Sequence, residues 1–482
     1  MITPRIAGVL IAALAAMPVA DLRAQGVTPA PLMIDEVLRA SEQHFPRILQ
    51  SLAARRAASG VALEAEGSFD LVFGADGFSR VAGFYDGTAI EGSAKQRLRP
   101  LGASVYAGYK LSSGDFPIYE DINYTNTGGA FKVGVLFSML RDRAIDPQRF
   151  RETDARLNLR QAELDLLLTK IGVQERALIA YWDWVAKGQQ LRVYEELLTI
   201  AIDREDGLEE QVRRGARAEI FLTENLQNIN RRQRLATAAQ RDLTIAANML
   251  SLYFRDQDGQ PVVVGPERLP PGRSINETYT EGTPPPVPVS ETLARRPELA
   301  ILRTAIERER NRLALAENDL KPRLDLAFEV QEGGLGSIAE GGPSRDSTDT
   351  VVGFTFSVPL QQRTGRGRIM QSRAKLDARE QEQRFREDQI ELEVRNLLVD
   401  LNVSRELLLI ADQEVQQAEI MRTAELRRFD SGASDFFLLN IREETAANAR
   451  IALFQAELAT RIARANYDAA TVDTGRLGIT PN

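Results

Sequence analysis

The hydrophobic residues between positions 145 and 252 recur at the spacing of long α-helices. Proline is absent after Pro147, and apolar side chains return every seventh residue up to a break at Arg214-Gly215, after which the series restarts. Heptad spacing predicts helices that pack along other helices, so we interpret the stretch as a helical hairpin with its tip near Gly215. At roughly 1.5 Å per residue, its first arm is on the order of 100 Å long. The recurring residues are Leu157, Leu164, Ile171, Leu178 and Val185, then Leu222, Ile229, Ala236, Leu243 and Leu250.

The second half of the chain repeats this pattern. A series from Ile390 to Val415 leads to Gly432, and a return series runs from Ala447 to Ala465. Phe137-Ser138 recurs as Phe356-Ser357 about 219 residues later, and Gly215 recurs as Gly432 about 217 residues later. The nearly constant offset indicates an internal duplication with two equivalent hairpin tips.

Ahead of each hairpin the hydrophobic period falls to about two, which is typical of β-strands. The candidate segments are 69–73, 103–109 and 131–137 in the first half, and 323–330 and 351–358 in the second. The first strand region, 68–140, is longer than the second, 322–360, so we interpret 80–127 as an insertion that adds strands or a folded loop. Outside this insertion we count four clear strands, too few to close a barrel in a bilayer, and therefore expect several protomers to associate cyclically.

These patterns divide the chain into five parts. Residues 1–24 contain an apolar run followed by small residues, as in a secretory signal peptide, and we expect this segment to be removed. The first structural repeat is assigned to 26–254 and the second to 291–470. Between them, residues 255–290 are rich in proline and glycine and are predicted to form an equatorial linker, while 471–482 form a C-terminal tail.

Composition excludes several classes of function. The net charge is −8 with mixed signs, which argues against a nucleic-acid partner. The chain has no cysteine, so thiolate catalysis, disulfides and lipidation of a mature cysteine are excluded, and its single histidine, His44, leaves no triad. We expect a protein that is not an enzyme, with no catalytic residue, cofactor or metal. The pairs Glu209-Glu210 and Glu443-Glu444 are interpreted as solvated helix faces, and Trp182 and Trp184 as packing residues.

The order of these segments resembles the TolC-like outer-membrane efflux family. The resemblance covers 34–471 and includes Arg296-Pro297-Glu298-Leu299, the strand exit Ser357-Val358-Pro359-Leu360 and Phe429-x-x-Gly432 at the second tip. It implies a mostly α fold with membrane β-structure: a homotrimer whose duplicated hairpins form a periplasmic α-barrel, capped by a shared 12-stranded β-barrel in outer-membrane lipid. The implied function is a passive exit duct of a tripartite efflux or type I secretion system, with a periplasmic adaptor and an inner-membrane pump as partners.

The resemblance also suggests residues at the tips. Gly215, Gly432, Arg214 and Ser434 are candidates for the tip turns and the adaptor contact. Many members of the family place an acidic residue six or nine positions after the second-tip glycine, where this chain has Leu438 and Ile441, and the matching first-tip residue is Phe221. These three are candidates for an apolar pore constriction, and the alternative is that Leu438 and Ile441 pack between helices.

One alternative from another functional class remains open. A periplasmic coiled-coil adaptor or scaffold would also have a signal peptide, long hairpins and no catalytic residues. Two equivalent hairpins, with strands at matched positions, favour the duct.

Overall fold

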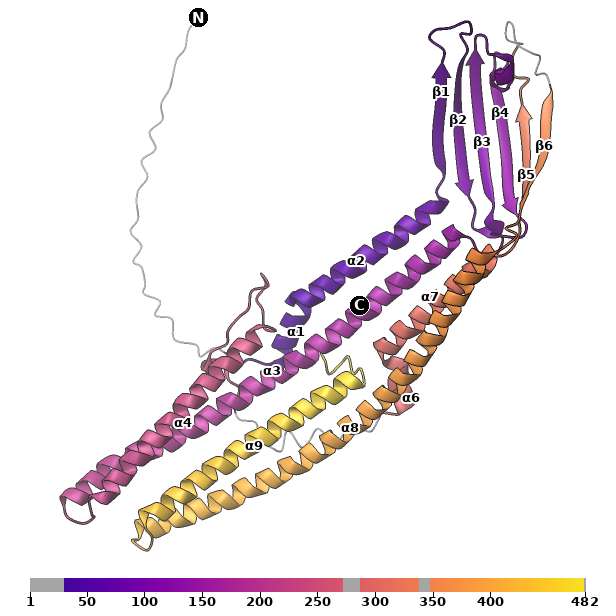
Figure 1. The fold of residues 1–482 in the computed structure, drawn as a ribbon. Helices are drawn as coiled ribbons and strands as arrows, with labels where there is room; N and C mark the ends of the chain where they lie inside the picture. The colour runs from indigo at the N-terminus through magenta and orange to yellow at the C-terminus, as the bar shows by residue number, and fades with distance from the viewer. Residues whose placement is uncertain (1–29, 272–286, 338–346, 481–482) are drawn as a thin grey trace, which may run out of the picture.

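The computed structural model describes residues 30–271, 287–337 and 347–480. A β-sheet lies at one end of the molecule and two hairpin tips lie at the other, with long helices between them (Figure 1). The predicted signal peptide lies outside the described residues, as do residues 272–286 of the predicted linker and 338–346 of a strand-connecting loop.

The first half of the chain leads from two helices through four strands into a hairpin. The two helices are α1 (Ile34–His44) and α2 (Pro46–Glu66). The strands are β1 (Val72–Ser79), β2 (Thr88–Arg97), β3 (Ser104–Ser113) and β4 (Ala130–Ser138). The hairpin consists of α3 (Pro147–Arg213) and α4 (Ile220–Ser251). Short 3-10 turns are η1 (Gly67–Phe69), η2 (Pro100–Gly102), η3 (Ile118–Asn123) and η4 (Pro266–Arg268).

The second half repeats this order with two strands in place of four. It contains α6 (Val289–Arg295), α7 (Pro297–Asp319), β5 (Arg323–Glu332), β6 (Thr348–Ser357), α8 (Arg363–Asp430) and α9 (Phe436–Ala470). The long helices α3 and α8 have 67 and 68 residues, and the return helices α4 and α9 have 32 and 35. The long hairpins predicted from the heptads are confirmed.

Both long helices end in the same hydrogen-bonded turn. At the first tip the Gly215 amide donates to Val212 and the next amide donates to Gln211; at the second, the Gly432 amide donates to Phe429 and the next donates to Arg428. This pair of bonds is the Schellman motif, which requires a left-handed residue after the helix. Gly215 has φ 70° and Gly432 has φ 75°, so each glycine reverses the chain without a side-chain clash.

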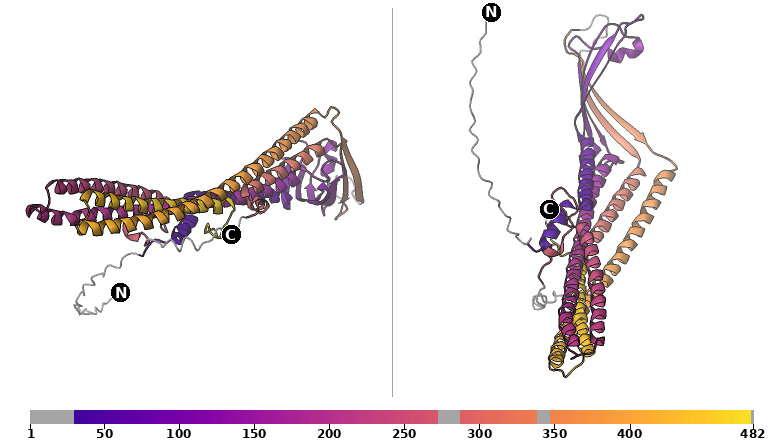
Figure 2. Two further views of the ribbon diagram at one scale, coloured as in Figure 1. Left: turned by 90° about the horizontal axis from the view of Figure 1, so that it is seen from below. Right: turned by 90° about the vertical axis from the view of Figure 1, so that its left-hand side faces the viewer.

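The helices lie side by side in one layer (Figures 1 and 2). Towards the tips the order across the layer is α4, α3, α9, α8, and towards the sheet it is α2, α3, α7, α8. The layer therefore has α2 and α4 along one side and α8 along the other. Within the described residues, no helix combines the length and hydropathy required to cross a bilayer.

The main core lies at mid-height, where α1, α3 and α4 meet. Trp184 has no exposed surface, and the hydroxyl of Tyr181 donates to the carbonyl of Leu32 at 3.0 Å. Trp182 packs against this cluster, with the guanidinium of Arg461 4.5 Å from its ring centroid. The interpretation of both tryptophans as packing residues is confirmed.

The strands form one antiparallel sheet in sequence order, β1 to β6. Its register places residues alternately on two faces. The polar face includes Glu91, Lys132 and Glu329, and the apolar face includes Phe73, Val133 and Val352. Every charged strand residue except Glu332 lies on the polar face.

The count of four strands is wrong, because the described residues contain six. Residues 80–127 supply β2 and β3, which pair over ten residues each and stand between β1 and β4. The segment is therefore an inserted strand pair rather than a folded loop. Three copies of a six-stranded sheet do not give the twelve strands that the resemblance implied.

Candidate functional site: the hairpin tips and the base of the sheet

The turn residues predicted as an adaptor contact lie at the exposed ends of the hairpins. Gly215 and Gly432 are exposed, and the Arg214 side chain is 74% exposed while it pairs with Glu210. Ser434 is held to the end of α8, because its hydroxyl donates to the buried carboxylate of Glu425. The structure thus brings the four residues to one end of the molecule, and their contact with an adaptor stays a prediction.

An aromatic cluster joins the two tips. Phe221 of α4 packs edge to face on Phe436 of α9, with ring centroids 6.5 Å apart. Phe429 at the end of α8 lies 6.1 Å from Phe436, and the guanidinium of Arg217 sits 4.6 Å from the centroid of Phe429. Phe221, predicted at a pore constriction, therefore lies in the seam between the hairpins of one chain.

Leu438 and Ile441 lie in the first turns of α9. The side chain of Asp435 caps this helix by accepting the amide of Leu438 at 2.7 Å. Leu438 is half-buried and Ile441 is 39% exposed, whereas their neighbour Leu439 is fully buried. Leu438 and Ile441 therefore present apolar surface that one chain does not cover, and their place at a constriction stays a prediction.

A buried charge cluster, which the sequence analysis missed, lies just above the aromatic cluster. Glu443 of α9 is 3% exposed and accepts hydrogen bonds from Arg232 of α4 at 2.9 Å and from Arg204 of α3. The amide oxygen of Asn440 lies 3.4 Å from both guanidinium groups. Burial lowers the pKa of the Arg232 guanidinium, and its hydrogen bond to Glu443 opposes that shift.

The interpretation of Glu443-Glu444 as a solvated face is therefore wrong. Glu443 is buried between the hairpins, and Glu444 is half-buried and pairs with Arg231. The sequence did carry a signal, because Arg232 stands three residues after Ile229 and Glu443 stands four before Ala447, both on apolar heptad faces. A charged residue at a core position of a heptad needs a buried partner.

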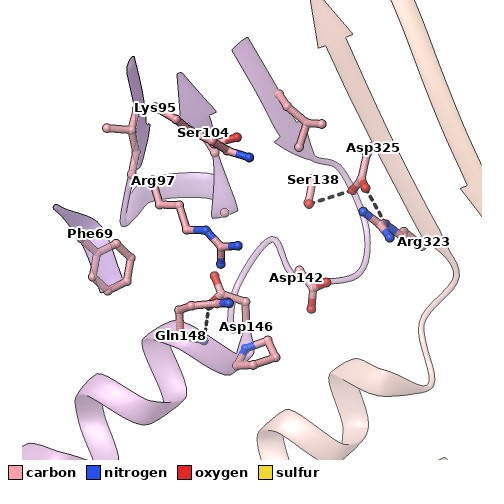
Figure 3. Close-up of a pocket in the computed structure, with 15 residues that line it drawn as sticks. Phe69, Lys95, Arg97, Ser104, Ser138, Asp142, Asp146, Gln148, Arg323 and Asp325 are labelled. Atoms are coloured by element: carbon pink, nitrogen blue, oxygen red, sulfur yellow. Dashed lines mark hydrogen bonds and ion pairs between the residues drawn. The ribbon is translucent and has the colours of Figure 1, made fainter. Parts of the chain in front are cut away.

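A second polar site lies at the base of the sheet, where the strands meet α3 (Figure 3). A cavity of about 310 Å³ opens on the polar face of the sheet there. Its carboxylates are engaged: Asp325 accepts from Ser138 at 2.8 Å and from Arg323, and Asp146 caps α3 through the amides of Gln148 and Arg149.

Two basic residues of β2 complete the cavity. Within the described part of the chain, the side chains of Lys95 and Arg97 form no ion pair or hydrogen bond, and both are exposed. Their charges are thus not neutralised by the engaged carboxylates. This lining can attract anions.

Comparisons with known proteins agree with this geometry. Residues 289–471 match the outer membrane efflux protein family, and no curated protein sequence matches the chain significantly. The fold is similar to the Neisseria gonorrhoeae MtrE outer membrane channel, with a TM-score of 0.63 and 13% identity, covering 92% of this chain and 89% of that one. The resemblance predicted from the sequence is confirmed.

Two further solved structures have the same fold. The Campylobacter jejuni CmeC outer membrane channel gives a TM-score of 0.60 at 13% identity, covering 91% of this chain and 85% of that chain. The outer membrane protein VceC of Vibrio cholerae gives 0.59 at 16% identity, covering 91% and 95%.

Proposed function

We propose that this chain, whose residues 289–471 match the outer membrane efflux protein family, is the outer-membrane exit duct of an export system. Its sheet lies in the outer membrane and its helices reach into the periplasm. Three copies form the duct. A periplasmic adaptor and an inner-membrane pump of a tripartite efflux or type I secretion system complete the path, and the duct itself catalyses no reaction.

The separation of polar and apolar residues between the two faces of the sheet carries this proposal. A strand that lines a water-filled barrel in lipid alternates apolar residues outward with polar residues inward. Here the apolar face presents side chains such as Phe73, Val133 and Val352, which are 76%, 43% and 73% exposed in one chain. Such a face suits hydrocarbon, whereas a soluble scaffold would need to cover it.

The two sides of the helical layer support cyclic assembly. Apolar side chains along α8 are uncovered, including Phe385, Leu392 and Val399 at heptad spacing, which are 63%, 60% and 59% exposed. On the opposite side, Leu63 of α2 and Ile245 of α4 are 71% and 54% exposed. Packing the α8 side of one copy on the α2 and α4 side of the next buries both surfaces and closes a tube.

The tips then form the periplasmic entrance. In a threefold assembly the exposed turns with Gly215, Gly432, Arg214 and Ser434 meet the adaptor. Leu438 and Ile441 lie one turn apart on α9, and three copies give stacked apolar rings that close a narrow pore by dewetting.

Labelling on whole cells tests the orientation. The chain has no native cysteine, so Val81→Cys in the β1–β2 turn, where the side chain is 95% exposed, gives a single reactive thiol. We expect it to react with an impermeant thiol reagent, while Arg214→Cys at a tip reacts only after the outer membrane is permeabilised. Reaction of Arg214→Cys alone on intact cells would contradict the proposed orientation.

A further inference from the structure

The two edge strands of the sheet have no partner strand within the described part of the chain. β1 and β6 each pair on one side only. In hydrocarbon an unpaired strand edge is not tolerated, because no water satisfies its amide and carbonyl groups. Six strands are also fewer than the eight that form the smallest filled barrel. The edges therefore need strands from other copies.

We propose that β1 of one copy pairs with β6 of the next, and that three copies close a barrel of eighteen strands whose wall includes the inserted strands β2 and β3. The three-copy assembly rests on the proposed function; the strand number does not follow from it. Because the sheet has an even number of antiparallel strands, β6 and the neighbouring β1 run in opposite directions. Repetition therefore continues the antiparallel order without a break.

The arrangement of the helices favours the same pairing of β6 with the neighbouring β1. β1 follows α2, which lies on one side of the layer, and β6 leads into α8, which lies on the other (Figure 1). Any contact that places α8 of one copy against α2 of the next also brings β6 towards the neighbouring β1. The same rotation from one copy to the next thus packs the helices together and pairs the strand edges.

Two contacts on the polar face tie the inserted strands into the wall. Tyr106 of β3 donates to Glu329 of β5 at 2.6 Å and passes over Gly134 of β4, where a Cβ would lie 2.2 Å from the tyrosine ring. Lys132 of β4 pairs with Glu91 of β2 at 2.5 Å and passes over β3.

The strand crossed by the second contact also has a glycine. A Cβ at Gly108 would lie 2.8 Å from the Lys132 side chain. Glycines that clear a path for long side chains across a strand fit a continuous wall, because a hairpin folded away from the barrel would need neither contact.

The apolar face is also continuous through the insertion. Its residues there include Ile90, Ala94, Val105 and Leu111, with no charge among them, while Glu91, Lys95 and Lys110 lie on the polar face. An insertion exposed to water on both faces would not need this separation.

At a strand tilt of about 40°, eighteen strands give a barrel about 36 Å across, whereas twelve give about 24 Å.

Adjacent cysteines in β2 test whether the insertion is in the wall. Ser93 lies on the polar face and Ala94 on the apolar face. Each is replaced by cysteine in the otherwise cysteine-free chain, labelled with a fluorophore and reconstituted in vesicles. We expect a nitroxide lipid to quench the label at Ala94→Cys and an aqueous quencher to reach the label at Ser93→Cys. Aqueous quenching at both positions, without quenching by the nitroxide lipid, would overturn the eighteen-stranded wall.

Disulfide trapping separates this inference from the proposed function. Ala75→Cys in β1 is combined in turn with Thr350→Cys, Val352→Cys and Phe354→Cys in β6. Within one chain these strands are five strand spacings apart, about 24 Å, too far for a disulfide. We expect covalent oligomers, with none when Ala107→Cys of the central strand β3 replaces Ala75→Cys.

The combined outcomes are distinct. Covalent oligomers together with a water-exposed Ala94 label leave the duct standing and refute only the strand number. No oligomer with any β6 partner, and no protein recovered in membranes, refutes the proposed function and the barrel together.

Discussion

Glu443 of α9 accepts a hydrogen bond from Arg232 of α4 at 2.9 Å, and the two side chains are 3% and 1% exposed. They are 211 positions apart and belong to different hairpins. Arg204 of α3 shares the same carboxylate. Any movement that separates the two tips must therefore expose or break this cluster.

Removal of the carboxylate should destabilise the protein strongly. Glu443→Ala leaves Arg204 and Arg232 without their shared counter-charge, which costs about 3–5 kcal/mol for a buried pair. Glu444→Ala is the matched control, since Glu444 is only half-buried against Arg231 and exposed pairs contribute about 0–1 kcal/mol. Thermal unfolding of the detergent-solubilised protein compares them, and equal losses would contradict the role of the cluster.

Replacing a tip glycine with alanine should lower stability, whereas replacing a glycine inside a helix should raise it. Gly432 has φ 75°, so Gly432→Ala costs about 1–2 kcal/mol. Gly207 lies inside α3, so Gly207→Ala should add up to about 1 kcal/mol of stability. At both positions a Cβ meets no atom within 4 Å, which leaves backbone conformation as the difference. Shifts of the same sign in melting temperature would refute this account.

The constriction is tested by two neighbouring leucines. Leu438→Asp should leave the trimer intact and make the channel in a planar bilayer more conductive and more cation-selective, because it places a charged ring in the pore. Leu439 is fully buried, so Leu439→Asp should instead lower trimer yield, since it buries an unpaired charge. Unchanged conductance and selectivity in an intact Leu438→Asp trimer would exclude Leu438 from the constriction.

Asp183 of α3 should make stability depend on pH. Burial raises the pKa of its carboxyl above its ordinary value; the nearby charge of Lys187 opposes this rise, and that of Asp242 adds to it. A raised pKa in the folded state means that stability falls as pH rises through that pKa. Asp183→Asn should therefore raise the melting temperature at pH 7, and the gain should vanish at about pH 3, where Asp183 is protonated in both the folded and the unfolded state. A gain from Asp183→Asn of the same size at about pH 3 and at pH 7 would contradict this role of burial.

The hairpins could be predicted from the sequence because helix packing repeats every seven residues. The spacing alone identifies residues such as Leu157 and Leu243 as those that face a neighbouring helix. β2 was missed because its apolar face contains Gly92 and Ala94, which give little contrast with the polar face. Its place became evident only through pairing with β3. The charge cluster was missed for another reason: the partner of Glu443 is 211 positions away, and spacing along one helix does not identify it.

Native mass spectrometry of the protein extracted from outer membranes tests the threefold assembly. Unpaired strand edges and an apolar sheet face require neighbours and lipid, so we expect a complex of three chains that is released only by detergent. A stable monomer, soluble without detergent, would contradict the duct and favour a periplasmic scaffold.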